Sequence, residues 1–178
     1  MGIAVYPEDS STAEELLKNA DTALHKAKEL VPHGYWFYNS ESSGLDDNPL
    51  KYIEALRLAK ENQEFCLYYQ PQVCLQTNRI TGVEALIRWQ HPHHGLLSPM
   101  HFIDLLEQTN LIVPVGEWVL RTVCQQIVSW RSKNLPQIHV AVNISAAQLL
   151  NDNFVETLMS IVDEFGISPD QIELEITE

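Results

Sequence analysis

The chain has 178 residues with 24 acidic and 11 basic side chains, which gives a formal charge of −13 when the seven histidines are neutral. Hydrophobic residues make up 45% of it, including four Trp, six Tyr and five Phe, so the chain can bury a core and is not generally disordered. The acidic balance argues against duplex nucleic acid or an anionic membrane as the main partner, because both bind basic surfaces.

Two further features of the composition concern the compartment. No apolar run reaches the roughly 18 residues of a membrane span, and no basic-then-apolar signal peptide opens the sequence. The cysteines, Cys66, Cys74 and Cys124, form an odd number without C-x-x-C spacing, which fits neither a disulfide framework nor a zinc knuckle. We therefore expect a cytoplasmic location and no direct insertion into a membrane.

The first 38 residues predict a strand, a helix and a second strand. A short β-type run from Gly2 to Pro7 leads into a polar turn, and apolar residues then recur at helical spacing up to Ala27. A capping box at Ser11 and Glu14, or at Thr12 and Glu15, would start this helix. Pro32 and Gly34 would end it, and the aromatic run 35–38 predicts the second strand. This β-α-β unit is too small to enclose a core by itself.

Residues 39–49 have the composition of a linker, with turn formers and acids around one leucine. A helix is expected from about Leu50 to Asn62. Beyond it, short β-rich runs alternate with amphipathic helices, one beginning at Ser98-Pro99, one from about Val115 to Asn134, and one ending at Phe165 before Gly166. The four runs are Phe65 to Gln72, Gly82 to Trp89, Ile138 to Ser145 and Gln171 to Glu178. This pattern predicts an α/β fold with a parallel sheet covered by helices.

Side-chain parity along the four runs gives each predicted strand one aliphatic face and one face with polar groups. The polar faces hold, in order, Cys66, Tyr68 and Gln70; Glu84, Leu86 and Arg88; Ala141, Asn143 and Ser145; Glu173, Glu175 and Thr177. For a single strand, solvent exposure would explain this alternation. Four strands that agree favour a site, because both faces of a parallel sheet are normally covered and sites in α/β folds lie at the C-terminal strand ends.

The polar residues on these faces suit a particular chemistry. Glu84, Asn143, Glu175 and the nearby Glu178 offer hard oxygen ligands, which favour Mg²⁺, Mn²⁺ or Ca²⁺ over zinc. Arg88 lies near the end of its run and is suited to clamp a phosphate. Oxygen-ligated metals beside an arginine indicate phosphoryl chemistry.

Two other groups of residues allow interpretations that the sequence favours less than the phosphoryl-transfer site. His91, His93, His94 and His101 lie close in sequence and would allow a zinc or nickel site, although no fixed ligand spacing is evident. Glu173 shares a face with Glu175 one layer deeper, where a structural pairing role is favoured over metal ligation.

Four ordered motifs make residues 65–178 resemble the first half of an EAL domain, the bacterial phosphodiesterase that linearises cyclic-di-GMP. They are Tyr68-Tyr69-Gln70-Pro71, Gly82-Val83-Glu84-Ala85-Leu86-Ile87-Arg88-Trp89, Val142-Asn143-Ile144-Ser145 and Glu173-Leu174-Glu175-Ile176-Thr177-Glu178. The resemblance implies a TIM-like (β/α)₈ barrel and metal-dependent hydrolysis of cyclic-di-GMP to linear pGpG with Mg²⁺ or Mn²⁺.

The same resemblance assigns roles to individual residues. It implies that Glu84, Asn143 and Glu175 are metal ligands, that Glu84, Glu175 and Glu178 are catalytic, and that Gln70, Leu86 and Arg88 bind substrate. Glu178 corresponds to a glutamate that supports the neighbouring active-site loop.

Residues 1–38 resemble the C-terminal end of a GGDEF domain, with the diagnostic Gly-Gly-Asp-Glu-Phe loop absent. Residues 50–178 would then be the N-terminal half of an EAL domain, truncated at its fourth strand, out of about 250 residues for such a barrel. We expect this chain to be inactive alone and open to self-association through its barrel edges. The alternative is a non-catalytic module that binds cyclic-di-GMP or a protein, including a half-barrel homodimer, and a longer parent could be tethered to a membrane.

Overall fold

The computed structural model of the chain describes residues 1–30, 36–38 and 49–176. It divides into two compact units, Met1–Leu58 and Ala59–Glu178, and each is described by itself. The predicted linker, residues 39–49, lies outside the described residues except for Pro49. Along the chain the elements are β1 (Gly2–Ile3), α1 (Ala13–Leu30), β2 (Trp36–Phe37), α2 (Pro49–Ala59), β3 (Phe65–Cys74), β4 (Arg79–His91), β5 (Gly95–Leu97), the 3₁₀ turn η2 (Pro99–His101), α3 (Ile103–Gln108), α4 (Ile112–Ser132), β6 (His139–Ile144), α5 (Ala146–Leu149), α6 (Phe154–Phe165), η3 (Pro169–Gln171) and β7 (Ile172–Ile176).

The first unit contains the predicted strand, helix and strand, with β1 and β2 parallel and α1 between them in sequence. The first strand is shorter than expected and ends at Ile3. Thr12 caps α1 through one bond of the second predicted capping box: the Glu15 N–H donates to Thr12 Oγ1 at 3.4 Å. The reciprocal bond differs, because the Thr12 N–H donates to Ser10 Oγ and the Glu15 carboxylate accepts from the hydroxyls of Ser10 and Thr12. Gly2 permits the close approach of β1 to this helix, because a Cβ there would lie 2.1 Å from the backbone nitrogen of Leu24.

The second unit is built on one sheet with strand order β3-β4-β6-β7, and β5 pairs with β4 beside this path. The strands β4, β6 and β7 run parallel, as the alternating pattern predicts. The prediction of a wholly parallel sheet is wrong, because β3 and β4 are antiparallel from Phe65↔Trp89 to Cys74↔Arg79. Only residues 75–78 join the two strands, and a turn this short closes a hairpin but cannot carry a parallel crossover.

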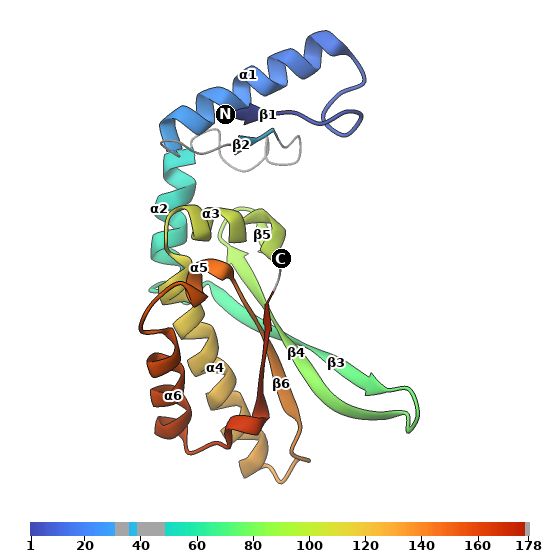
Figure 1. The fold of residues 1–178 in the computed structure, drawn as a ribbon, viewed down its shortest axis with the longest axis vertical. Coiled ribbons are helices and arrows are strands. Elements are labelled where there is room, and N and C mark those ends of the chain that lie inside the picture. Colours follow the sequence, from blue (N-terminus) through green and yellow to red (C-terminus); the bar gives the residue numbers. More distant parts are fainter. Residues whose placement is uncertain (31–35, 39–48, 177–178) are drawn as a thin grey trace. The chain divides into compact units, whose positions relative to one another are not determined.

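Helices α4 and α6 lie on one side of the sheet (Figure 1) and bury its aliphatic face. The core between these layers includes Val140, Val142 and Ile144 from β6 and Leu120 and Ile161 from the two helices. Burial of this apolar surface stabilises the fold by roughly 25 cal/mol for each Å² that is removed from water. The prediction that Val140, Val142 and Ile144 form the aliphatic face of their strand is therefore confirmed.

Of three predicted helix boundaries, the end of α6 is confirmed, and the starts of α4 and of the helix after Ser98-Pro99 differ. The long helix begins at Ile112 rather than at Val115, because Pro114 lies in its first turn, where the missing N–H has no intrahelical partner to lose. Helix α6 ends at Phe165, and Gly166 follows it in the left-handed conformation with φ of 57°, as predicted. The segment after Ser98-Pro99 forms the short turn η2 before α3.

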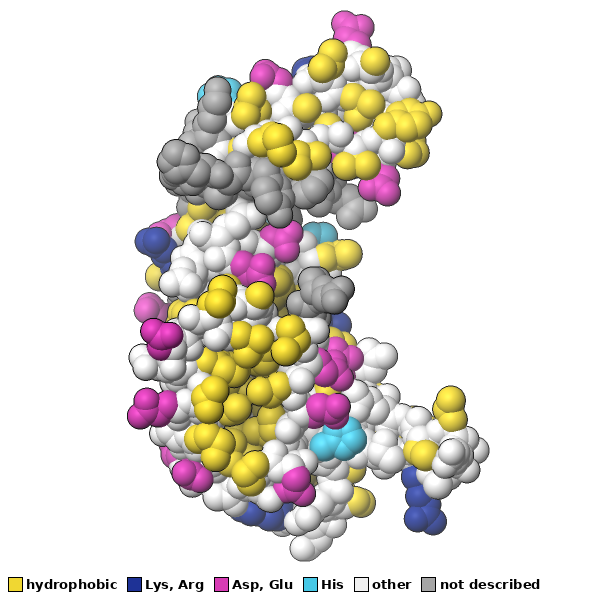
Figure 2. All heavy atoms as spheres, in the orientation of Figure 1, with side chains coloured by type: hydrophobic (Ala, Val, Ile, Leu, Met, Phe, Trp, Pro, Cys, Tyr) yellow, Lys and Arg dark blue, Asp and Glu magenta, His cyan; other side chains and the backbone are white. Residues whose placement is uncertain are grey.

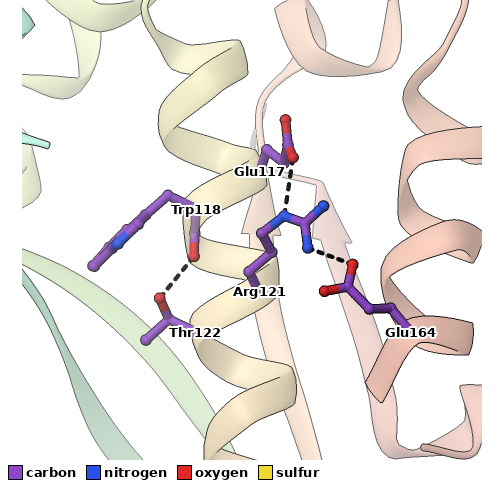
Figure 3. Close-up of polar contacts among 5 residues, drawn as sticks. All are labelled: Glu117, Trp118, Arg121, Thr122 and Glu164. Carbon is purple, nitrogen blue, oxygen red and sulfur yellow. Dashed lines mark hydrogen bonds and ion pairs between the residues drawn. The ribbon is translucent and has the colours of Figure 1, made fainter. Parts of the chain in front are cut away.

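The two helices that cover the sheet are also joined at their surface. Arg121 on α4 donates from Nε to Glu117 at 3.0 Å and from Nη1 to Glu164 on α6 at 2.6 Å (Figure 3). Both carboxylates raise the pKa of Arg121, chiefly by hydrogen bonding. The hydroxyl of the next residue, Thr122, donates to the backbone carbonyl of Trp118, one turn earlier on the same helix.

The sheet is open, and in the described part of the chain the strand order ends at β3 on one side and at β7 on the other. On the aliphatic face of β7, which α4 and α6 do not fully cover, Leu174 is 37% exposed and Ile176 is 64% exposed. Their register partners on β6, Val142 and Ile144, are buried. Figure 2 shows hydrophobic side chains gathered on the surface between α6 and β7.

Candidate functional site

The face of the sheet away from α4 and α6, called here the polar face, carries the side chains that parity predicted. The strand register places Gln70 opposite Glu84, Glu84 opposite Ala141, and Asn143 opposite Glu175. Side chains that are opposite in register point to the same side of a sheet. The prediction that these four polar residues share one face is confirmed.

Glu84 and Asn143 are in direct contact. The Asn143 Nδ2 amide donates a hydrogen bond of 2.7 Å to Glu84 Oε1, which joins β4 to β6 on the polar face. This bond uses the amide nitrogen and leaves Asn143 Oδ1 as a further acceptor. Glu175, opposite Asn143, extends the same row onto β7.

The donors on this row fit a metal ion by their chemistry, although they include only two acidic side chains. In the part of the chain that the structure describes, no group of three or more His, Cys, Asp or Glu side chains could hold one. The row instead offers two carboxylates and one amide oxygen on three neighbouring strands, and such hard oxygen donors suit Mg²⁺ or Mn²⁺. The predicted catalytic Glu178 lies outside the described residues.

Arg88 lies on the polar face near the end of β4, directly opposite Cys66. Its Nη1 donates to the backbone carbonyl of Ile87 at 2.8 Å, and its Cζ lies 5.7 Å from the centroid of the Tyr68 ring. Burial raises the pKa of the Cys66 thiol, and the positive charge of Arg88 opposes that shift. The guanidinium is therefore held against strand β3 with N–H groups left over for an anion.

A second polar row lies one layer toward the start of the parallel strands, and parity alone did not single it out. His139 Nε2 is 3.1 Å from Gln72 Oε1 and 3.3 Å from Glu173 Oε2, so this ring nitrogen carries a hydrogen shared between two acceptors. The His139 ring lies over Gly82, where a Cβ would be 2.2 Å from Nε2. This contact supports the predicted structural pairing role of Glu173.

A cavity of about 410 Å³ opens beside the middle of β4, at Ala85–Ile87, and the end of β6. Leu86, a predicted substrate contact, lines it together with Asn143, Asp104 and Glu107, and the rest of its wall is largely apolar. The buried Gln148 side chain also borders it and closes a capping box with Ser145 at the start of α5. The sequence offered no periodic signal for this cavity, because its walls come from separate helices and strand ends.

The histidines after β4 form a turn rather than a metal-binding group. The backbone N–H groups of His93 and His94 both donate to His91 Nδ1, at 3.2 and 3.3 Å. His91 is buried and its ring packs against Trp89 at a centroid distance of 4.7 Å. Two backbone donors on Nδ1 leave that atom without a lone pair for a metal, so these contacts do not favour the zinc or nickel alternative.

The fold and the polar face together define the class of protein. Residues 53–178 match the EAL domain family, and the chain belongs to that family. No helix among the described residues is both long and apolar enough to cross a membrane.

Two curated relatives match this chain over its whole length. It is 39% identical over 178 residues to the bifunctional diguanylate cyclase/cyclic di-GMP phosphodiesterase MucR of Pseudomonas aeruginosa, covering 100% of this chain and 26% of that protein. It is 35% identical to the cyclic di-GMP phosphodiesterase PdeR of Escherichia coli, covering 100% of this chain and 27% of that one. The chain thus spans about a quarter of the length of these curated relatives.

Solved structures agree with the sequence matches. The PaMucR phosphodiesterase in its c-di-GMP complex aligns with a TM-score of 0.69 and 38% identity, over 72% of this chain and 52% of that one. The EAL enzyme Bd1971 with cAMP and cyclic-di-GMP bound aligns with a TM-score of 0.67 and 29% identity, over 95% of this chain and 44% of that one. The chain is therefore an EAL-family protein related to cyclic-di-GMP phosphodiesterases.

Proposed function

We propose that this chain acts in cyclic-di-GMP signalling as the first half of an EAL phosphodiesterase barrel, and that its polar face binds cyclic-di-GMP with divalent metal ions. One observation carries the proposal: Glu84 and Asn143 are hydrogen bonded on the polar face, with Glu175 opposite Asn143 on the next strand. The match to about half of the PaMucR phosphodiesterase chain supports the half-barrel interpretation.

The three residues of this row would hold Mg²⁺ or Mn²⁺ through Glu84, Asn143 Oδ1 and Glu175. When bound, such ions lower the pKa of water and stabilise charge on a phosphodiester, which is the chemistry that hydrolysis to linear pGpG requires. The protein's own contribution is to place Glu84 on β4 and Glu175 on β7 on one face, with Asn143 on β6 between these strands and its amide donating to one Glu84 oxygen. Glu178 is proposed as a catalytic glutamate that supports the neighbouring active-site loop.

Arg88, Gln70 and Leu86 would bind the dinucleotide itself. Arg88 supplies charged N–H donors for a phosphate, and Gln70 lies beside Glu84 on the polar face. Leu86 faces the cavity of about 410 Å³, whose apolar wall suits a purine base. At its border, Asp104 and Glu107 can accept the N1–H and N2–H groups of guanine.

Residues 1–38 are proposed as the end of a GGDEF domain, residues 39–49 as a linker, and residues 50–178 as the EAL half. The parallel pairing of β1 and β2 around α1 supports the first assignment. So does the match of the whole chain to MucR, whose name includes a diguanylate cyclase. Since the described polar face brings together only two carboxylates and one amide, we expect residues 1–178 by themselves to bind cyclic-di-GMP without turning it over.

The test is calorimetric titration of cyclic-di-GMP into the purified chain with Ca²⁺, Mg²⁺ or EDTA, followed by chromatography of the nucleotide. Binding is expected with either cation and not with EDTA, and no pGpG should appear. Glu84→Gln should weaken binding tenfold or more, because a charged hydrogen-bond partner and metal ligand contributes about 1.5–3 kcal/mol.

Glu156→Gln is the matched control, since Glu156 is an exposed carboxylate on α6, away from the polar face, and should leave the affinity unchanged. Metal-dependent pGpG release that Glu84→Ala abolishes would contradict the expected lack of turnover. Metal-independent binding that Glu84→Gln does not change would contradict the proposed metal-binding role of the row of Glu84, Asn143 and Glu175.

A further inference from the structure

Tyr68 and Arg88 form a contact on the polar face that the proposed roles do not explain. Tyr68 lies opposite Leu86 in the antiparallel pair, while Arg88 lies opposite Cys66, so the two residues are diagonal neighbours on one face. Such neighbours are within reach of one another when one side chain is aromatic and the other is long. The Arg88 Cζ is 5.7 Å from the Tyr68 ring centroid, within the range of a cation–π interaction.

The rest of the Arg88 guanidinium is available. Its Nη1 donates to the carbonyl of Ile87 at 2.8 Å, and among the residues that the structure describes its other N–H groups have no hydrogen-bond acceptor. The guanidinium therefore has one anchor on the backbone and one on an aromatic ring. Both anchors leave the forked donors that match a phosphate unused.

Tyr68 itself is unusual for a large aromatic side chain, because 49% of its surface is exposed. Its neighbour Tyr69 points to the opposite side of β3 and packs edge-on against Trp130, with centroids 5.2 Å apart. Tyr69 is partly buried against the hydrophobic core, and this burial raises its pKa to about 12. Tyr68 has no such role in the core, and the described ring contact that it makes is the one with Arg88.

We propose that Tyr68 is a positioning residue: its ring holds the Arg88 guanidinium in place before a phosphate arrives. Arginine has a long side chain with high rotamer entropy, so a donor fork that is fixed in advance loses less freedom when it binds an anion. The identity of the anion, a phosphate of cyclic-di-GMP, rests on the proposed function, whereas the contact between Tyr68 and Arg88 is independent of it.

The first experiment therefore needs no ligand. ¹⁵N relaxation of the Arg88 Nε–Hε group is measured in the full chain and in Tyr68→Leu, Tyr68→Phe and Val73→Ala. Tyr68→Leu should increase the mobility of this group, while Tyr68→Phe should keep it restrained because phenylalanine retains the ring face. Val73→Ala removes a similarly exposed side chain from the same strand and should change nothing. Equal Arg88 mobility in the unchanged chain and in Tyr68→Leu would overturn the proposal.

The second experiment measures cyclic-di-GMP affinity with Ca²⁺ for the same variants. Tyr68→Leu should weaken binding about two- to fivefold, the range that an exposed cation–π contact corresponds to, and Tyr68→Phe should bind like the unchanged chain. In an Arg88→Ala background, Tyr68→Leu should have no further effect. An equal loss in both backgrounds would overturn the proposal, whereas absence of any binding by the unchanged chain would contradict the proposed function, with the relaxation data deciding the role of Tyr68.

Discussion

Successive residues of β6 meet two different environments. Val142 and Ile144 are each 1% exposed and pack against α4 and α6, whereas Asn143 between them is exposed and donates to Glu84. The same strand thus contributes to the core with alternate residues and to the polar face with the residues between. Stability should depend on the first set and ligand binding on the second, and substitutions one residue apart can separate the two.

The largest effect on stability is expected from Ile144→Ala. Removal of a buried aliphatic side chain leaves a cavity and should lower the free energy of unfolding by about 2–5 kcal/mol. Urea titration followed by circular dichroism measures this change. Asn143→Ala, one residue away, should change the same quantity by less than about 0.5 kcal/mol. Comparable losses in the two variants would contradict the division between the faces.

A smaller but distinct effect is expected from Gly82→Ala on the polar face. The added Cβ would lie 2.2 Å from His139 Nε2, so the ring must leave its contacts with Gln72 and Glu173. Overpacking of this kind costs about 1–3 kcal/mol in unfolding experiments. His139→Ala frees the space, and the double variant should therefore be no less stable than His139→Ala alone. Additive losses would show that the collision with His139 is not the cause.

The aliphatic side chains of β7 differ from those of β6, because Leu174 and Ile176 remain exposed on the same face where Val142 and Ile144 are buried. The third prediction concerns this exposed part of the face. Because Ile176 is 64% exposed next to an open strand edge, the chain should self-associate at high concentration, and more so in salt that screens the charge of −13. Ile176→Lys should reduce the weight-average mass measured by light scattering. Val155→Lys, on α6, is the control for added charge away from the edge. A strict monomer at all concentrations would reject self-association through this edge.

The smallest effect is expected from Arg121→Ala, which removes the surface ion pairs between α4 and α6 (Figure 3). Exposed pairs contribute little, since water and salt screen them. The urea midpoint should shift less than for Ile144→Ala or Gly82→Ala, and the shift should vanish in 1 M salt. A loss that persists in high salt would indicate that Arg121 packs against the helices through its aliphatic stem.

Much of this arrangement follows from period-two alternation. That alternation placed Glu84, Asn143 and Glu175 on one face and Val142 and Ile144 on the other, because side-chain direction on a strand is fixed by local geometry. Alternation carries no information on strand direction, so the antiparallel pairing of β3 with β4 was missed. The short connection at residues 75–78, with Asn78 at φ of 53°, is the local signal that could have indicated a hairpin.

Other parts of the site depend on contacts between distant segments. The His139 ring over Gly82 and the cavity beside Leu86 arise only when separate strands and helices meet, and no short window of sequence encodes them. The glycine was a usable hint, since an isolated glycine inside a strand often marks the close approach of another group. The cation–π contact of Tyr68 with Arg88 could be anticipated only after the hairpin register was known.

The hairpin of β3 and β4 also bears on the order in which the chain folds. Its ten register pairs connect residues that are close in sequence, whereas β6 and β7 must each return to the sheet after a helix. Local pairings form fast, because little loop-closure entropy is lost before the contacts are made. We expect Gln70 and Glu84 to be side by side early in folding, with Asn143 and Glu175 joining them late, so that hydrogen exchange pulsed during refolding should protect β3 before β7.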